Sequence, residues 1–217
     1  NRIFCGMIKD SVYLRDRQMR NLGGIKSMRK VVKFGGSSLA SAEQFKKVGD
    51  IIRADKGRKY VVPSAPGKRF DGDIKVTDML YACYAKAEKK EDITASIAAI
   101  RERYMEIING LGLSLSLDDQ FEVISENFKK LAGSNYAASR GEYLNGIIMA
   151  NYLGYEFIDA AEVIVFHEDG TFDAETTNEK LSARLAECDN AVIPGFYGAT
   201  AEGKVTTFSR GGSDITG

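Results

Sequence analysis

The chain has few of the side chains that most often build metal centres and nucleophilic triads. His167 is the single histidine among 217 residues, which excludes a histidine-rich metal site and argues against a histidine-based triad. The three cysteines, Cys5, Cys83 and Cys188, are odd in number, far apart and not in zinc-ligand spacing. We therefore expect reduced thiols rather than a disulfide or a metal site.

Long hydrophobic runs and an excess of one charge are also missing. No apolar run approaches the roughly 20 residues of a membrane-spanning helix, and the N-terminus is charged, so we expect a cytoplasmic protein without a membrane partner. Bases and acids number 30 each, but six bases and two acids precede Met28. The remaining 24 bases and 28 acids give residues 28–217 a net charge of −4, which argues against a nucleic-acid partner.

The length and the 44% hydrophobic content suit one domain with a substantial core. Residues 1–27 lack clean periodicity and carry two glycines, Gly23 and Gly24, shortly before Met28, so we interpret them as an N-terminal extension outside the domain, with a basic regulatory arm as the alternative. The domain is expected to cover residues 28–217. The chain stops at Gly217, where a helix is expected to begin, so the sequence predicts part of a longer protein.

The most informative stretch is VVKFGGSS, residues 31–38. Its apolar residues predict a buried strand, and the paired glycines allow a turn without a Cβ penalty. Ser41 with Gln44 forms a capping box that predicts a helix just beyond the loop. A strand, a glycine loop and a helix start present unpaired N–H groups, which suits a phosphate. Because Lys33 precedes the glycines, neither common glycine-loop fingerprint applies, and a tight turn with a solvated lysine is the alternative.

The rest of the chain alternates between predicted strands and helices. Tyr60–Pro63 predicts a second strand, parallel to the first through a right-handed crossover. Residues 65–75 are rich in turn formers and predict a mobile loop before a helix capped by Thr77. Further helices are expected at 93–110, 121–131, from Ser139 to 152, and from a Thr176–Glu179 cap to 185, with strands at 155–158, 163–166, from 191 and at 205–208. This order predicts a three-layer α/β/α sandwich with a mainly parallel sheet.

Several polar residues fall where a parallel sheet binds ligands, beyond the carboxyl ends of its strands. Lys33, Ser64 and Thr77 lie there, together with a second glycine loop that carries Arg210. Lysine and loop N–H groups suit phosphates, whereas an arginine fork matches a carboxylate. One site could hold a nucleoside triphosphate and a carboxylic acid. Because such an acid is ionised at neutral pH, transfer would need alignment and charge neutralisation rather than a general base.

Each candidate also has a purely structural interpretation. Glu142 follows Ser139 by three residues, which is the spacing of a capping box, and Thr77 could be a simple N-cap. Asp214 could cap a following helix, and Arg210 could pair with a surface acid. The residues alone leave these alternatives open.

Five segments, in this order, resemble the amino-acid kinase superfamily and specifically its aspartate kinases. They are KFGGSS from Lys33, SAPGK from Ser64, TD from Thr77, SRGE from Ser139 and SRGGSD from Ser209. The resemblance covers residues 28–217, and Ser37 stands where the family usually has threonine.

The resemblance implies transfer of the γ-phosphoryl group of ATP, with Mg²⁺, to the β-carboxylate of L-aspartate in lysine, threonine and methionine biosynthesis. The product would be 4-phospho-L-aspartate. The implied phosphate-binding residues are Lys33, Gly35, Gly36 and Ser37. The implied aspartate-binding residues are Ser64, Thr77, Glu142, Arg210 and Ser213, with Glu142 facing the ammonium group and Arg210 the α-carboxylate. The implied catalytic residues are Lys33 and Asp214.

The family continues beyond this point into the segment that holds adenine and Mg²⁺-ATP, then into regulatory domains that usually mediate dimerisation. The resemblance therefore implies a homo-oligomer for the full-length protein and an incomplete nucleotide pocket in these 217 residues. Two alternatives remain open. The chain could belong to a relative acting on glutamate, acetylglutamate or UMP, or it could be a non-catalytic ligand-binding fragment.

Overall fold

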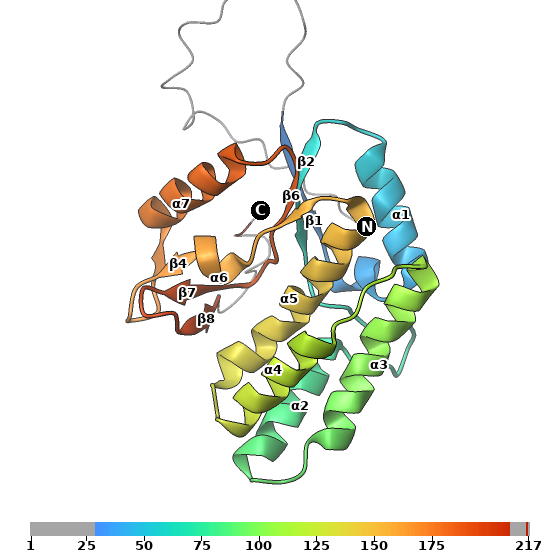
Figure 1. The fold of residues 1–217 in the computed structure, drawn as a ribbon, viewed down its shortest axis with the longest axis vertical. Helices are drawn as coiled ribbons and strands as arrows, with labels where there is room; N and C mark the ends of the chain where they lie inside the picture. The colour runs from blue at the N-terminus through green and yellow to red at the C-terminus, as the bar shows by residue number, and fades with distance from the viewer. Residues whose placement is uncertain (1–28, 209–215, 217) are drawn as a thin grey trace, which may run out of the picture.

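The computed structural model describes residues 29–208 and Thr216, and a parallel sheet lies at its centre (Figure 1). The strand order is β1–β2–β6–β3, and each neighbouring pair is parallel. The strands are Lys30–Phe34 (β1), Arg58–Pro63 (β2), Glu156–Phe157 (β3) and Ala191–Val192 (β6). The predicted parallel pairing of the first two strands is confirmed, and their carboxyl ends lie at one edge. The predicted extension over residues 1–27 lies outside the described residues.

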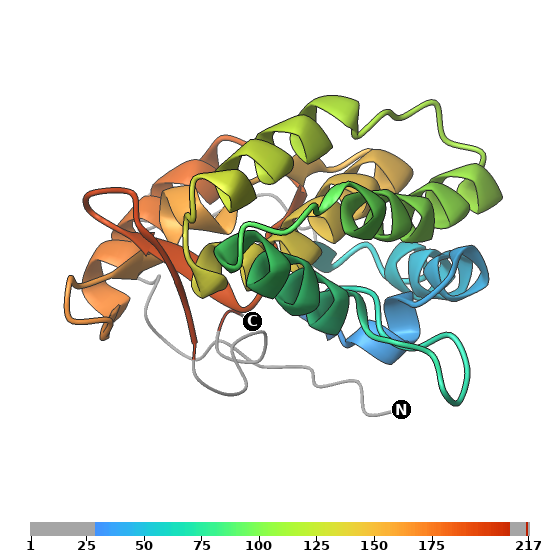
Figure 2. The ribbon, with the colours of Figure 1, turned by 90° about the horizontal axis from the view of Figure 1, so that it is seen from below.

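The predicted helices occur in the predicted order, and the short helix α6 (Ala160–Val163) is one that the sequence did not predict. They are α1 (Ala42–Arg53), α2 (Val76–Glu88), α3 (Thr94–Leu111), α4 (Asp118–Lys129), α5 (Ser134–Leu153), α6 (Ala160–Val163) and α7 (Ala174–Ala186), with a 3-10 turn η1 (Gly36–Leu39) before α1. Seen from below, α2, α3 and α4 gather along α5 (Figure 2).

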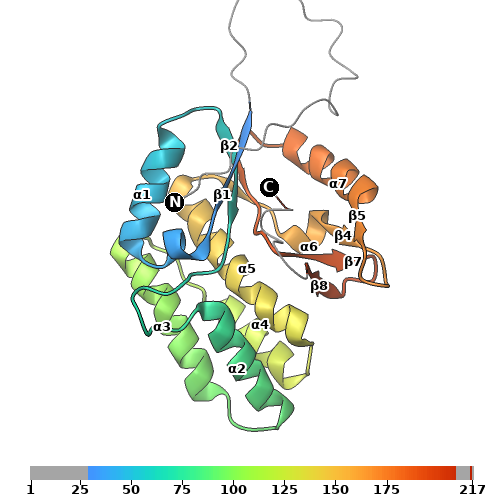
Figure 3. The ribbon, with the colours of Figure 1, turned by 180° about the vertical axis from the view of Figure 1, so that it is seen from behind.

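Alternate residues of the central strands belong to two separate cores. Val32, Phe34 and Val61 join the apolar cluster formed with α1 to α5. Tyr60, Ala191 and the segment after β6 join the cluster formed with α6 and α7. Successive strand side chains point to opposite faces, so each face of the sheet needs its own covering layer. Figures 1 and 3 show α1 and α7 on opposite sides of the sheet, which confirms the predicted three layers.

A second, smaller sheet has the order β5–β4–β7–β8. Its strands are Val165–Phe166 (β4), Phe172–Asp173 (β5), Tyr197–Thr200 (β7) and Val205–Thr207 (β8). β4 and β7 are parallel, while the outer pairs are antiparallel. The sequence did not predict this division into two sheets, because strands of two to four residues leave little periodicity to read.

Three predicted helix starts are wrong. α5 begins at Ser134, after Gly133 with φ +102°, so the SRGE segment lies inside the helix. α7 is capped by Asp173, whose carboxylate accepts the Thr176 N–H, rather than by Thr176. α2 begins at Val76, so Thr77 lies within its first turn and is not the N-cap.

Two of the three cysteines lie within the described residues. Cys83 and Cys188 are free, and burial raises the pKa of the Cys83 thiol to about 11. Cys5 lies outside the described residues. Within residues 29–208, none of the helices combines the length and the apolar character that a membrane span requires.

Candidate functional site

Backbone contacts at the carboxyl ends of β1 and β2 leave no room for a side chain. The Ser64 N–H donates to the Phe34 carbonyl oxygen at 3.0 Å, and the Gly67 N–H donates to the Gly36 carbonyl oxygen at 2.8 Å. A Cβ atom on Gly36 would lie 2.7 Å from the Ala65 carbonyl oxygen, and one on Gly67 would lie 2.7 Å from the Gly36 carbonyl carbon. Both glycines are therefore required by the close approach of two backbones.

The glycine loop leads into the 3-10 turn η1 rather than directly into α1. Gly35 is the N-cap of this turn, and the exposed Ser37 lies within it. The predicted cap of α1 is confirmed, because the Ser41 hydroxyl accepts the Gln44 N–H. Lys33 precedes the loop on β1 and is partly buried. Strand alternation places its side chain on the face opposite to Val32, toward the α6–α7 layer.

Helices α2 and α5 meet the β2–α2 loop at Gly141. A Cβ atom on Gly141 would lie 2.8 Å from the Ala65 Cβ, 3.4 Å from Leu80 Cδ1 and 3.7 Å from the Thr77 hydroxyl oxygen. Thr77 and Ala65 therefore lie directly against the helix that carries Glu142. The glycine of the SRGE segment is explained by this close packing.

Glu142 is a buried carboxylate in the middle of α5. It is 6% exposed, and its Oε2 atom has no hydrogen-bond partner. Burial raises the pKa of Glu142 to about 7, although the Ala65 backbone N–H and the Arg140 charge act in the opposite direction. Because the residue lies well inside the helix, the capping interpretation is wrong. A buried acidic oxygen without a donor is suited to a cationic ligand group.

Two further polar side chains hold this part of α5, and sequence reasoning missed both. The Asn145 side-chain amide donates to the Ser64 carbonyl oxygen at 2.6 Å, while its Oδ1 atom is buried and has no partner. The Tyr104 hydroxyl of α3 donates to the Gly141 carbonyl oxygen at 2.8 Å. An asparagine one helical turn after Glu142, at the start of the apolar stretch that ends α5, was the local signal that could have found the first contact.

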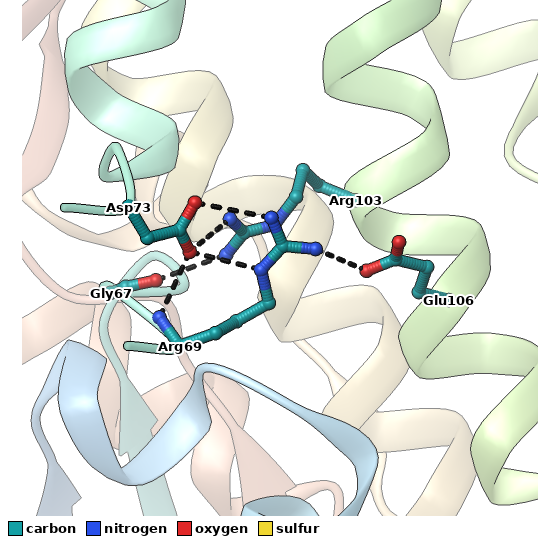
Figure 4. A network of polar contacts seen from close by, with 5 residues as sticks. All are labelled: Gly67, Arg69, Asp73, Arg103 and Glu106. Atoms are coloured by element: carbon teal, nitrogen blue, oxygen red, sulfur yellow. Dashed lines mark hydrogen bonds and ion pairs between the residues drawn. The ribbon is translucent and has the colours of Figure 1, made fainter. Parts of the chain in front are cut away.

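A network of charged side chains holds the β2–α2 loop from α3 (Figure 4). Residues 64–75 contain no helix or strand, as predicted, yet Asp73 binds two arginines. Arg103 donates to Asp73 at 2.6 Å and to the Gly67 carbonyl oxygen at 3.0 Å. Arg69 binds Asp73 at 2.9 Å and Glu106 at 2.6 Å. The arginines hold the pKa of Asp73 far below its usual range, with Arg69 as the largest cause.

The described chain brings together four of the predicted site elements. The glycine loop after Lys33 contacts the loop after Ser64, and that loop packs against α5 beside Thr77 and Glu142. Arg210, Ser213 and Asp214 lie outside the described residues, so their predicted roles stay predictions. In the part of the chain that the structure describes, no group of three or more histidine, cysteine, aspartate or glutamate side chains could hold a metal ion.

The described residues thus form a three-layer α/β fold in which a glycine loop and a buried carboxylate contact the same loop between β2 and α2. The chain belongs to the amino acid kinase family, which it matches over residues 28–217.

The similar proteins within this family are aspartokinases. Aspartokinase 3 of Bacillus subtilis (strain 168) is 39% identical over 204 residues, which cover 87% of this chain and 44% of that protein. The aspartokinase of Chlamydia trachomatis is 29% identical over 202 residues, which cover 86% of this chain and 44% of that protein. The chain thus spans less than half the length of these relatives.

Solved structures give the same assignment of fold. The crystal structure of Clostridium acetobutylicum aspartate kinase matches with a TM-score of 0.83 and 51% identity, covering 86% of this chain and 43% of that chain. Escherichia coli aspartokinase III in complex with aspartate and ADP matches with a TM-score of 0.68 and 25% identity, covering 86% of this chain and 44% of that chain.

Proposed function

We propose that this chain provides the amino-acid-binding part of an aspartate kinase. The reaction would transfer the γ-phosphoryl group of ATP to the β-carboxylate of L-aspartate and give ADP and 4-phospho-L-aspartate. Similarity to the aspartokinases of Bacillus subtilis and Clostridium acetobutylicum supports this proposal. The complex of the Escherichia coli protein with aspartate and ADP supports the same pair of ligands.

The observation that carries the proposal is the buried carboxylate of Glu142 beside the glycine loop region. Its partnerless Oε2 atom suits the ammonium group of an amino acid. The adjoining Ala65 belongs to the loop whose Gly67 contacts Gly36. An amino acid held at Glu142 would therefore lie next to the segment that suits phosphate. The remaining proposed contacts to aspartate come from Ser64, Thr77, Arg210 and Ser213.

The chemistry requires alignment more than proton transfer. The β-carboxylate of aspartate has a pKa near ~4 and is ionised at neutral pH, so it can attack the γ-phosphorus directly. An oxygen–phosphorus bond forms as the bond between the γ-phosphorus and the β,γ-bridging oxygen breaks, and ADP leaves with the electron pair. Lys33 and the N–H groups of Gly35, Gly36 and Ser37 would neutralise the charge on the phosphate oxygens. We assign Asp214 the role of orienting the charged groups around the phosphates.

Mg²⁺ would arrive with the nucleotide. This ion is commonly held by one or two carboxylates together with substrate phosphates, which fits the lack of an acidic cluster within residues 29–208. When bound, it would neutralise phosphate charge. The free thiols support a reducing compartment, and we place the enzyme in the cytoplasm, in the synthesis of lysine, threonine and methionine. We further propose a homo-oligomer for the full-length protein.

A substrate panel tests the proposal. ADP release by the full-length protein is measured with L-aspartate, L-glutamate, N-acetylglutamate and UMP as acceptors, and hydroxylamine traps any acyl phosphate. We expect turnover with aspartate alone. Turnover with glutamate or UMP but not aspartate would contradict the assignment. Calorimetry of the 217-residue chain with aspartate and with ATP tests the alternative of a binding fragment, which predicts aspartate binding without turnover in any form of the protein.

A further inference from the structure

The loop between β2 and α2 is hydrogen-bonded to two other parts of the candidate site. At one end, the Gly67 N–H donates to the Gly36 carbonyl oxygen at 2.8 Å. Next to it, the Pro66 carbonyl oxygen accepts the Val76 N–H at 3.2 Å, at the first turn of the helix that carries Thr77. A shift of this loop would therefore move the glycine loop and the start of α2 together.

Arg103 of α3 links two points of the loop. Its guanidinium group donates to the Gly67 carbonyl oxygen at 3.0 Å and to the Asp73 carboxylate at 2.6 Å (Figure 4). Arg103 is 5% exposed, and the Asp73 side chain is 9% exposed, so water competes little for either contact. Gly67 is thus held through both of its backbone groups: its N–H donates to the Gly36 carbonyl oxygen, and its carbonyl oxygen accepts from Arg103.

This arrangement is suited to fixing geometry rather than to adding stability. Burying an ion pair costs desolvation energy that its attraction barely recovers. The Nε atom of Arg103 is also buried without a hydrogen-bond partner, which adds a further cost. An apolar side chain could fill the same space without either cost. It could not bind the Gly67 carbonyl oxygen.

We propose that Arg103 and Asp73 are positioning residues for the glycine loop. Asp73 orients the guanidinium group, Arg103 holds the Gly67 peptide unit, and Gly67 holds Gly36. The proposal rests on the proposed function, in which the Gly36 segment binds the phosphates of ATP. Loss of the pair would leave both substrates able to bind but would misplace the phosphates, and small misplacements of reacting groups cost up to about 100-fold in rate.

Steady-state kinetics of the full-length protein test the pair. In Arg103→Lys the charge remains, but a single ammonium group lacks the planar fork that spans Asp73 and Gly67. Arg103→Met removes the charge, and Asp73→Asn keeps the shape of the carboxylate. For all three we expect kcat/KM for ATP to fall by about 10-fold to 100-fold, with KM for aspartate changed by less than about 3-fold.

Arg101→Met is the matched control. Arg101 lies on the same helix and pairs with Asp118, but both side chains are exposed. We expect unchanged kinetics in this variant. If Arg103→Lys and Arg103→Met also bind and turn over ATP as the wild type does, whatever their melting temperatures, the pair serves only stability and the proposal is wrong.

Hydrogen exchange separates this proposal from the proposed function. We expect the amides of residues 35–39 and 64–68 to exchange faster in Arg103→Met and Arg103→Lys than in the wild type, with α4 unchanged as an internal reference. Unchanged exchange in these segments would overturn the positioning role. A wild-type protein that does not phosphorylate aspartate would instead overturn the proposed function, and the exchange comparison would still decide the role of the pair.

Discussion

The two halves of the candidate site are built in different ways. On the side where we propose that phosphate binds (the phosphate side), Gly36 and Gly67 bring two backbones so close that no Cβ atom fits at either position. On the side where we propose that aspartate binds (the amino-acid side), buried polar side chains on α5 provide the shape, and both Glu142 and Asn145 keep an acceptor atom without a partner. The first half is defined by the absence of side chains, whereas the second is defined by their chemistry.

This difference predicts which changes each half tolerates. A backbone contact cannot adjust by choosing another rotamer, so added volume on the phosphate side should damage the fold and the function together. A buried side chain can be replaced by one of the same shape, so changes on the amino-acid side should alter binding or titration while the fold persists. Four substitutions or conditions test this contrast, from the largest expected effect to the smallest.

The largest effect is expected from Gly36→Ala. Its Cβ atom would lie 2.7 Å from the Ala65 carbonyl oxygen and 3.1 Å from the Gly67 nitrogen, and both are backbone atoms. We expect the free energy of unfolding to fall by about 3 kcal/mol and kcat/KM for ATP to fall by about 100-fold. Chemical denaturation and steady-state kinetics measure the two effects.

Gly35→Ala is the control for stability. A Cβ atom there meets nothing within 4 Å, and the φ of −77° suits any residue. Its unfolding free energy should match that of the wild type. Equal stability of the Gly36 and Gly35 variants would show that the phosphate side tolerates side chains, and the contrast would fail.

The second effect is a dependence of stability on pH that arises from Glu142. Burial raises the pKa of Glu142 from 4.5 to about 7. As the pH rises, the Glu142 carboxyl group therefore loses its proton at a lower pH in the unfolded chain than in the folded one. The contribution to stability is complete below about pH 4.5 and is lost as the pH rises through 7. One pKa unit corresponds to about 1.4 kcal/mol, so the free energy of unfolding should fall by roughly 3 kcal/mol over this window.

Urea titrations of the wild type and of Glu142→Gln between about pH 4 and pH 8 measure how the free energy of unfolding of each protein depends on pH. Subtracting the slope of the variant from that of the wild type removes the contribution of the other carboxylates and leaves that of Glu142. Parallel slopes would mean that folding does not shift the pKa of Glu142, and the buried, unpaired description of this carboxylate would be incorrect.

The third effect is the loss of aspartate binding in Glu142→Gln. A neutral amide oxygen can still accept a hydrogen bond from the substrate ammonium group, but it lacks the negative charge of the carboxylate, so the proposed ion pair is lost, at a cost of about 1.5–3 kcal/mol. We expect aspartate affinity to fall by about 10-fold to 100-fold while ATP affinity stays the same. Calorimetry with each ligand measures the two affinities. If the variant binds aspartate as tightly as the wild type, Glu142 does not contact aspartate.

The smallest effect is expected from Asn145→Ala. This change removes the 2.6 Å hydrogen bond to the Ser64 carbonyl oxygen and leaves that oxygen without its donor. The expected loss of unfolding free energy is about 1–2 kcal/mol, together with a KM for aspartate raised by about 3-fold. If Asn145→Ala lost more unfolding free energy than Gly36→Ala, the amino-acid side would tolerate substitution less well than the phosphate side, contrary to the contrast proposed above.

Local signals in the sequence predicted one half of the site better than the other. The strand, the paired glycines and the Ser41 cap are encoded within about ten residues, and the structure confirms all three. The start of α5 was predicted wrongly, because Ser139 and Glu142 have capping-box spacing while Gly133 places the true start five residues earlier, at Ser134.

Contacts between distant segments could not be predicted from local patterns. Arg103 reaches Gly67 across 36 positions of sequence, and Asn145 reaches Ser64 across 81. Neither pair has a spacing that marks it, since charged and amide residues are common on helices. The resemblance of five short segments to known kinases carried the assignment further than the physics of any one segment, although the roles of Arg210, Ser213 and Asp214 stay predictions.

Gly141 sets the distance between α5 and the elements packed against it on the amino-acid side. Where α5 crosses α2 and the β2–α2 loop, the Ala65 methyl group occupies the space that a side chain at position 141 would need. Because α5 contacts Ala65 and Thr77 through a residue without a side chain, the separation between Glu142 and Thr77 depends on direct contact between these elements and not on the rotamer of a longer side chain. We expect a methyl group added at position 141 to push α5 away from Ala65 and so to change the space beside Glu142 for the amino acid that we propose binds there.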